Sequence, residues 1–150
     1  MAAKGKHVIF LGPNEKVSPQ ILEAPAENAG LLPGMLIGLN ASGNFIPNAT
    51  ADAKAAPIIA QENYLEQKTT DDAYTDGDTV YGIQVRDGEY VNVLVNAGNN
   101  ITAMNTPLTS NGDGTFKIGN ANLSDAIFLS AEIINVTGSD ALVRAKKLVS

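Results

Sequence analysis

The sequence predicts a mostly β protein, either a small β-barrel or a β-sandwich, with short helical turns and an extended N-terminal arm. Short runs of β-branched and aliphatic residues recur along its 150 residues, and clusters of Gly, Asn, Asp and Pro separate them. This spacing is typical of all-β sandwiches and barrels. Asp87-Gly88 lies between two β-branched runs, which is the strongest short-range signal for a β-hairpin.

The expected strands of the first half follow the turn signals in order. A proline before an apolar run suits the start of a strand, and Pro57 has that position. The alanine-rich residues 48–56 lie between prolines, and we expect a loop there. The strands expected before the Asp87-Gly88 turn cover residues 7–11, 35–39, 44–46, 57–61 and 79–86.

The second half continues the alternation of strands and turns. Val91, Val93 and Val95 occupy alternate positions, so we expect this wholly β-branched face to lie in the core. A second hairpin turn is expected at residues 137–140. Helix should be limited to one or two turns, because isolated helices this short are marginal. The further strands expected cover residues 89–95, 115–118, 126–136 and 141–149, and the helical turns 19–24 and 62–67.

The composition suits a single domain with an aliphatic core. A chain of this length buries about 68–70% of its unfolded surface, which is enough for a real core. Aromatic residues make up 5% and Trp is absent, so Val, Ile, Leu and Ala must fill most of the interior. We expect a flexible arm at residues 1–6 and one β-rich domain at residues 7–150. The large core residues are expected to be Phe10, Phe45, Phe116 and Phe128.

The formal charge of −6 falls within residues 62–89, which we call the acidic stretch. Nucleic-acid binding depends on Lys and Arg neutralising phosphates, so an acidic stretch argues against it. We expect these acids to form a solvated face that aids solubility. The apolar run at residues 8–11 is shorter than the about 7–15 residues of a signal peptide or the about 20 of a membrane span. A soluble, unexported protein with no membrane partner is therefore expected.

The sequence lacks the residue combinations of common enzymes. Its one histidine, His7, lies near the N-terminus, so a Ser-His-Asp triad would have to form on the arm. One His with no Cys cannot form a zinc site. Phosphate-binding glycine motifs are missing, and the Asn-Gly-Asp-Gly run at 111–114 is interpreted as a turn rather than a calcium loop. We expect no catalytic, cofactor-binding or metal-binding residue, no cofactor and no enzymatic activity.

An ordered set of segments resembles the decoration (cement or head-stabilisation) proteins of tailed bacteriophages. The resemblance covers roughly residues 30–150 and rests on the order of the segments. They are 57–60 (Pro-Ile-Ile-Ala), 62–65 (Glu-Asn-Tyr-Leu), 70–74 (Thr-Asp-Asp-Ala-Tyr), 76–80 (Asp-Gly-Asp-Thr-Val), 86–91 (Arg-Asp-Gly-Glu-Tyr-Val), 108–117 (Leu-Thr-Ser-Asn-Gly-Asp-Gly-Thr-Phe-Lys) and 126–132 (Ala-Ile-Phe-Leu-Ser-Ala-Glu).

The resemblance implies a non-enzymatic structural protein that binds the outside of an expanded phage capsid and stabilises the head. Its partners would be the major capsid protein and other copies of itself, as homotrimers at three-fold positions. It would be found on the outer surface of the virion, and in the host bacterial cytoplasm during assembly. Lys4, Lys6 and His7 are the expected capsid contacts, because a basic arm can order against an acidic surface. The acidic stretch would then face away from the three-fold axis.

Two other classes of protein fit the same composition. One is another phage structural component, such as a tail or fibre domain or a minor coat protein. The other is a glycan-binding β module, which would need a face of exposed aromatic side chains. The four tyrosines all lie in or next to the acidic stretch, at Tyr64, Tyr74, Tyr81 and Tyr90.

Overall fold

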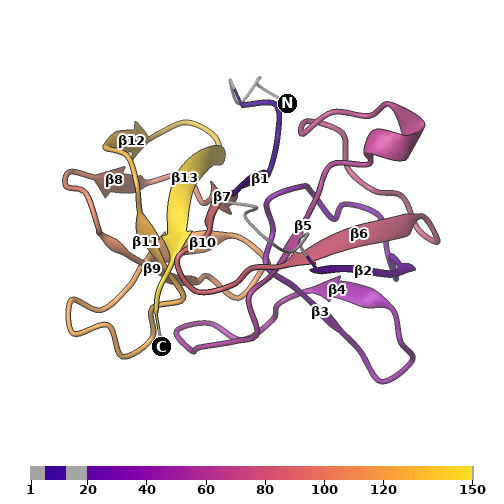
Figure 1. Cartoon of the computed structure of the whole chain (residues 1–150), viewed down its shortest axis with the longest axis horizontal. Helices are drawn as coiled ribbons and strands as arrows, with labels where there is room; N and C mark the ends of the chain where they lie inside the picture. Colours follow the sequence, from indigo (N-terminus) through magenta and orange to yellow (C-terminus); the bar gives the residue numbers. More distant parts are fainter. Residues whose placement is uncertain (1–5, 13–19, 150) are drawn as a thin grey trace.

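The protein is almost entirely β, as the sequence predicted. The structure, a computed structural model, describes residues 6–12 and 20–149. Strands account for 42% of the residues and helix for 2%. A closed five-stranded barrel forms one half of the molecule and smaller sheets form the other, with the N-terminal segment running between them (Figure 1).

The barrel is built from strands of the C-terminal half. They pair in the order β7-β10-β9-β11-β13, and β13 returns to pair with β7, which closes the ring. Every pairing in the ring is antiparallel except that of β10 with β7, where Phe116 lies opposite Val95. The strands are β7 (Tyr90–Val95), β9 (Pro107–Ser110), β10 (Phe116–Ile118), β11 (Phe128–Ser130) and β13 (Ala141–Lys147).

The remaining strands lie beside the barrel or in the other half of the molecule (Figure 1). Strand β1 (Phe10–Gly12) pairs with the beginning of β7, and β8 (Asn99–Ile101) forms a two-stranded ribbon with β12 (Ile134–Val136). The other half of the molecule holds a sheet in the order β2-β6-β5 and a hairpin of β3 with β4. Their bounds are β2 (Gln20–Pro25), β3 (Ile37–Leu39), β4 (Phe45–Pro47), β5 (Ile58–Ala60) and β6 (Thr79–Gln84), and a 3-10 turn, η1 (Tyr64–Glu66), follows β5.

One hydrophobic cluster fills both halves. The expected core face of β7 is confirmed, since Val91, Val93 and Val95 are fully buried. Asn92 and Leu94 on the opposite face are buried as well, because the N-terminal segment covers Asn92 and the chain around Gly34 packs over Leu94. Of the four phenylalanines expected in the core, three are fully buried and Phe10 is partly buried.

The expected hairpin at Asp87-Gly88 is wrong, although a turn is present there. The backbone N–H of Glu89 donates to the carbonyl of Arg86 at 3.1 Å, and Gly88 has a φ of 83°. The strands on either side enter different sheets: β6 pairs with β2 and β5, whereas β7 pairs with β1, β10 and β13. The turn is held from outside by β13, since Gly88 N–H donates to the carbonyl of Lys147 at 3.1 Å.

Two further expectations need correction. Residues 126–136 form two strands, and β12, which precedes the turn at 137–140, pairs with β8 and not with β13. Strand β13 instead pairs with β11, the earlier strand of that segment. The helical turn expected at residues 19–24 is strand β2, described from Gln20 onward, because pairing along β6 outweighs a weak local helical preference. The expected turn at 62–67 is present as η1, and residues 48–56 form a loop.

Gly34 connects the two halves of the molecule. Its N–H donates to the carbonyl of Ala60, the last residue of β5, at 2.8 Å, and its carbonyl accepts from Leu94 of the barrel at 2.9 Å. A Cβ atom on Gly34 would lie 2.5 Å from Leu142 Cδ2 and 3.1 Å from Leu94 N. The φ of 92° also disfavours any residue with a Cβ. Only glycine allows the two halves to approach this closely.

Replacing Gly34 by alanine should lower the free energy of unfolding by about 2–4 kcal/mol, since positive φ and overpacking each contribute about 1–3 kcal/mol. Gly30→Ala is the matched control, because Gly30 has a φ of 99° and no atom within 4 Å of an added Cβ. The control should lose only the part of the free energy of unfolding that comes from the positive φ, about 1–2 kcal/mol. Urea denaturation of both variants measures the difference, and equal losses would contradict the role of close packing at Gly34.

Candidate functional site

The N-terminal segment, residues 6–12, is bound to both halves of the molecule. The Thr70 hydroxyl donates to the carbonyl of Lys6 at 2.6 Å. Asn92 on β7 donates twice, from its side-chain amide to the carbonyl of Val8 at 2.7 Å and from its backbone N–H to the carbonyl of Ile9 at 2.8 Å. The Ile9 side chain is fully buried. The segment therefore has a fixed position against the core.

The three expected capsid-contact residues have different surroundings. Lys4 lies outside the described residues. Lys6 was expected in a flexible arm, but its ammonium group lies 3.0 Å from a carboxylate oxygen of Glu132 and its side chain is only 26% exposed. The ion pair and the Thr70 hydrogen bond fix Lys6 to the body. His7 is exposed and lines a groove.

The groove lies between the N-terminal segment and the chain that leaves β5. We call it the His7–Lys68 groove, and its volume is about 470 Å³. The N-terminal segment and the residues after β5 supply its walls, so its shape depends on how these two distant parts of the sequence are fixed together. The residues that line it are His7, Val8, Phe10, Gln61, Glu62, Tyr64, Gln67 and Lys68.

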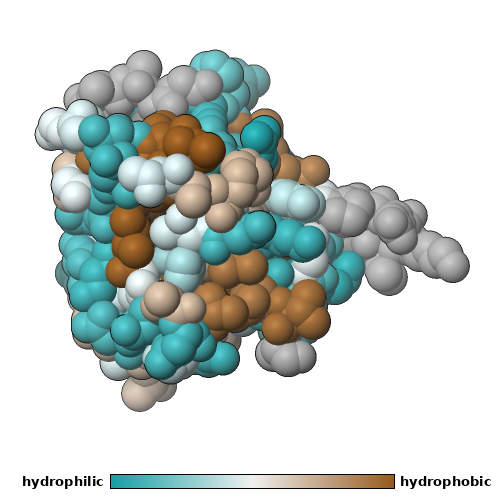
Figure 2. Space-filling model, turned by 90° about the vertical axis from the view of Figure 1, so that its left-hand side faces the viewer, coloured by the Kyte–Doolittle hydropathy of each residue, from teal (hydrophilic) through white to brown (hydrophobic). Residues whose placement is uncertain are grey.

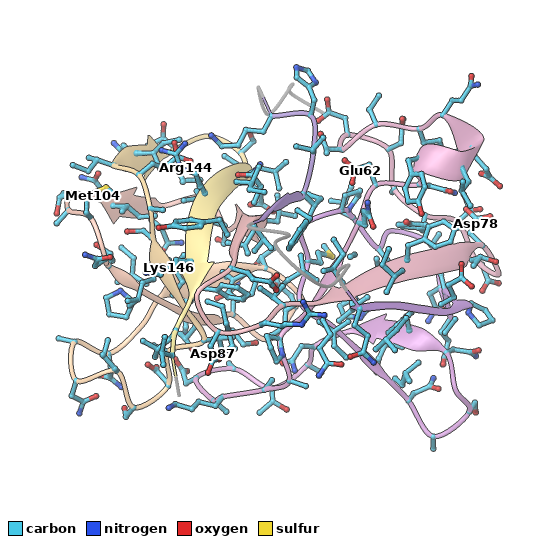
Figure 3. The ribbon with its side chains drawn as sticks, in the orientation of Figure 1. Glu62, Asp78, Asp87, Met104, Arg144 and Lys146 are labelled. Carbon is cyan, nitrogen blue, oxygen red and sulfur yellow. The ribbon has the colours of Figure 1, made fainter. Side chains whose placement is uncertain are left out.

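Glu62 is a buried carboxylate in the wall of this groove, with 7% of its surface exposed (Figure 3). It lies beyond the end of β5, where the backbone N–H of Gln61 donates to the carbonyl of Tyr81 on β6 at 2.7 Å. The Ile9 N–H and the Gln61 side chain donate to the Glu62 carboxylate, but Oε1 has no hydrogen-bond partner among the described residues. Burial raises the pKa of Glu62, and these hydrogen bonds partly offset the rise.

Four buried oxygen atoms at this place lack a hydrogen-bond donor in the described part of the chain. Gln61, Glu62 and Asn63 are consecutive in the sequence, and Asn92 is the residue that holds Val8 and Ile9. Native proteins pair most buried polar atoms, and each exception calls for an explanation, such as strain, a functional role or a bound water or ion. The unpaired atoms are Gln61 Oε1, Glu62 Oε1, Asn63 Oδ1 and Asn92 Oδ1.

Sequence reasoning missed this site because it assigned Glu62 to a solvated acidic face. In the structure, Glu62 and Glu89 of the acidic stretch are buried, while the other acids lie at the surface. These do not share one face, since Asp78 and Asp87 lie on different parts of the molecule in Figure 3. The one signal in the sequence was the polar run Gln61-Glu62-Asn63 directly after an apolar strand.

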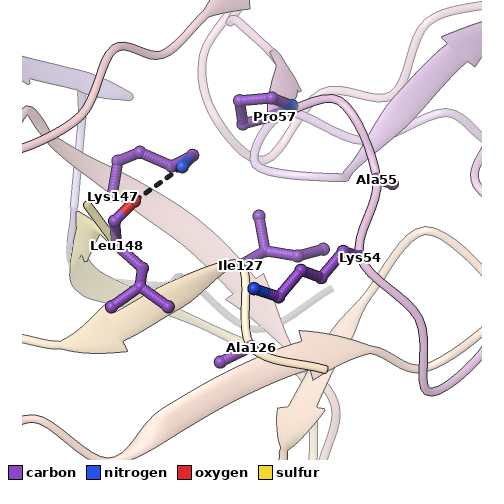
Figure 4. A pocket seen from close by; sticks show the side chains of 7 residues that line it. All are labelled: Lys54, Ala55, Pro57, Ala126, Ile127, Lys147 and Leu148. Carbon is purple, nitrogen blue, oxygen red and sulfur yellow. Dashed lines mark hydrogen bonds between the residues drawn. The ribbon is translucent and has the colours of Figure 1, made fainter. Parts of the chain in front are cut away.

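A second cavity, of about 220 Å³, lies between the loop before β5 and the ends of β11 and β13 (Figure 4). Lys147 in its wall has its charge compensated, because its ammonium lies 3.1 Å from Asp87 and donates to the carbonyl of Leu148 at 2.7 Å. None of the buried unpaired oxygens found in the described residues belongs to this cavity. It is the weaker candidate. Its lining residues are Lys54, Ala55, Pro57, Ala126, Ile127, Lys147 and Leu148.

The tyrosines do not form an exposed aromatic platform. Tyr74 is 1% exposed, and its hydroxyl donates to the carbonyl of Gln61 at 2.6 Å. Tyr81 is 8% exposed and packs against Tyr64, with ring centroids 5.4 Å apart. Tyr90 is half-buried, with the Lys146 ammonium 5.9 Å from its ring centroid. Tyr64 alone among the four is exposed, which is too little for a stacking surface.

The end of the molecule that carries β8 and β12 has a mixed surface. Figure 2 views this end, and its hydrophobic side chains lie in separate groups with hydrophilic side chains between them. Met104 and Ile133 are the largely exposed apolar residues near these strands, at 53% and 63% exposure. Small separated apolar groups of this kind are ordinary on soluble proteins.

Within residues 6–12 and 20–149, no cluster of three or more His, Cys, Asp or Glu side chains is arranged to hold a metal ion. The described helix is too short and too polar to cross a bilayer. Comparison of the sequence with models of known protein families finds no match, and comparison with curated proteins finds none. The choice of the His7–Lys68 groove as the candidate site therefore rests on its geometry alone.

Replacing Glu62 by glutamine should raise the stability of the protein at pH 7. The raised pKa means that the neutral carboxyl stabilises the fold below the unfolded value near 4.5, and that this contribution is lost as the pH rises through the folded value. Glutamine stays neutral at every pH. Its amide nitrogen can take the place of Oε1, which accepts no hydrogen bond from the described residues. A gain of about 1 kcal/mol corresponds to a melting temperature about 2–4 °C higher.

The measurement is thermal unfolding of wild type and Glu62→Gln between pH 4 and pH 7. The difference between the two proteins should shrink toward pH 4, and comparing them at each pH removes the contributions of the other carboxylates. Asp76→Asn, in an exposed residue of the acidic stretch, should change the melting temperature little at either pH. A Glu62→Gln variant that is less stable than wild type at pH 7 would contradict the prediction.

Proposed function

We propose that the protein is a non-enzymatic decoration protein that binds the outer surface of a phage capsid and stabilises the expanded head. The observation that carries this proposal is the N-terminal segment, which is fastened to both halves of a rigid β body and keeps His7 and Val8 exposed. A segment held this way binds a surface with little loss of conformational entropy. The ordered resemblance of residues 30–150 to phage decoration proteins supports the same role.

The alternative classes receive less support. A glycan-binding module needs exposed aromatic rings, and among the four tyrosines only Tyr64 is exposed. A tail, fibre or minor coat component would share the β body, and no particular contact favours it over capsid decoration. The His7–Lys68 groove lies beside the exposed N-terminal segment, and a projecting loop of a shell protein can enter it.

The proposal extends to assembly, in which three copies act together at a three-fold position. Three linked copies raise the apparent affinity for a shell by about 10²–10⁴ when all can bind at once. The surface acids of the acidic stretch are spread over different parts of the molecule, so each copy can turn a less acidic side toward the axis (Figure 3). The ion pairs of Lys6 with Glu132 and of Lys147 with Asp87 reduce the local charge further.

Capsid binding is tested with expanded, undecorated heads of a tailed phage that encodes this chain. The double change His7→Ala with Val8→Ser should weaken binding about 5–30-fold, the equivalent of 1–2 kcal/mol, while the melting temperature stays unchanged because both residues are exposed. Leu39→Ser, in an apolar residue that is 54% exposed on β3, is the control and should bind as wild type. Co-sedimentation measures the affinities, and failure of the wild-type protein to bind heads would refute the proposal.

Trimer formation is tested by light scattering of the free protein at low and high salt, together with reconstruction of decorated heads. We expect either a species with three times the 15.6 kDa chain mass or three copies around each three-fold position. Higher salt should favour the trimer, since it screens repulsion between chains with a net charge of −6. Isolated single copies on the shell would be incompatible with this assembly.

A further inference from the structure

The wall of the His7–Lys68 groove holds unpaired hydrogen-bond acceptors, and these oxygen atoms are shielded from solvent. Gln61 and Glu62 in its wall each have a buried oxygen atom without a donor, and Asn63 next to them has another. A buried acceptor left unpaired costs about 1–3 kcal/mol. A ligand that brings donors and no acceptors relieves this cost when the side chains of Gln61 and Glu62 turn toward the groove.

The orientation of the side-chain amides is fixed in the free protein, so the unpaired acceptors do not depend on which way the amides are turned. The Asn63 amide nitrogen donates to Glu66 at 3.0 Å, and the Asn92 amide nitrogen donates to the carbonyl of Val8 at 2.7 Å. The Gln61 side chain donates to the Glu62 carboxylate. Turning any of these amides over would place two acceptors against each other. The oxygens must therefore stay on the unpaired side.

The charge at the groove is also uncompensated. Lys68 at the rim forms an ion pair with Glu66, with its ammonium 3.4 Å from the carboxylate. In the described part of the chain, no Lys, Arg or His side chain forms an ion pair with Glu62. A buried carboxylate without a cation is costly, and a positive group at the groove would relieve that cost.

The groove also has walls suited to a flat cationic group. Tyr64 lines it with 45% of its surface exposed, and its ring is held in place by packing against Tyr81. Val8 and Phe10 of the N-terminal segment add apolar surface to the lining. Arginine has a long apolar stem, five N–H donors, no acceptor and a planar head that stacks on aromatic rings. The lysine ammonium is a compact point charge, so it donates to fewer acceptors at the same time than the arginine guanidinium does.

We propose that the His7–Lys68 groove is a docking site for an arginine side chain of a protein partner, with the Glu62 and Gln61 side chains turning toward it as acceptors and Tyr64 as the stacking surface. This inference rests on the proposed function in one respect, because on a decorated head the arginine belongs to the major capsid protein. The arginine fills the groove beside the exposed His7 and Val8, so one partner loop contacts both. The planar guanidinium group provides the specificity, and the exposed N-terminal segment beside it adds contact area.

The test is an NMR titration of the full chain with the peptide acetyl-Gly-Arg-Gly-amide at pH 7. Backbone amide signals of residues 7–10 and 61–68 should shift and saturate, whereas the citrulline peptide, which has the same shape without the charge, should bind at least about tenfold more weakly. The lysine peptide should also bind more weakly. Equal shifts with the arginine and citrulline peptides, or no shift at millimolar peptide, would overturn the proposal.

Two variants separate recognition from folding. Glu62→Gln should weaken binding of the arginine peptide about tenfold or more without lowering the melting temperature, and Asp76→Asn, with the same change of charge, should bind within about twofold of wild type. Unchanged binding by Glu62→Gln would overturn the role of Glu62. Should Glu62→Gln fail to fold, the comparison of the arginine and citrulline peptides on wild-type protein still decides the proposal.

Other occupants are distinguished in the same experiment. Saturating shifts of residues 61–63 with calcium chloride, and none with the arginine peptide, would identify a metal site and overturn the proposal. Peptide binding that appears only after deletion of residues 1–5 would identify the chain's own terminus as the occupant and would also overturn it. Binding of the peptide without binding of heads would refute capsid decoration alone, whereas binding of heads without binding of the peptide would refute only the groove.

Discussion

The close approach of the chain at Gly34 to strand β7 determines how the two halves of the protein fit together. Its backbone hydrogen bonds reach Ala60 at the end of β5 on one side and Leu94 of the barrel on the other, and Leu142 occupies the space that a side chain would need. The hydrophobic cluster continues through this junction without a break. Because β5 is fixed here, Gln61 and Glu62, which follow it, are fixed relative to the barrel as well.

The N-terminal segment makes a second connection across the same junction. It reaches β7 through Asn92 and the loop after η1 through Thr70, and Lys6 adds an ion pair with Glu132. These two connections join the N-terminal segment and the residues after β5, which form the walls of the His7–Lys68 groove. Groups that bind a partner are more effective when their positions are fixed before binding, since less entropy is lost.

The charges at the surface and the buried carboxylate of Glu62 act on recognition in different ways. Most of the negative charge lies on side chains at the surface, where salt screens it within about 8–10 Å. Glu62 differs, because its side chain is buried and its Oε1 has no hydrogen-bond donor in the described part of the chain. A surface charge of this size affects solubility and association rate, whereas a buried acceptor selects the chemical type of the group that enters.

The β class, the loop at residues 48–56, the buried face of β7 and three of the four core phenylalanines were all predictable from the sequence. Each depends on local pattern: period-2 alternation, turn residues and residue type. The partners of the strands were not predictable, since Asp87-Gly88 and residues 137–140 encode turns but do not encode which strands pair. The hydrogen bond from the Ile9 backbone to the Glu62 carboxylate likewise joins residues 53 positions apart in the sequence. Such pairings are decided by which arrangement buries the most apolar surface while pairing the backbone, and only the tertiary structure determines that.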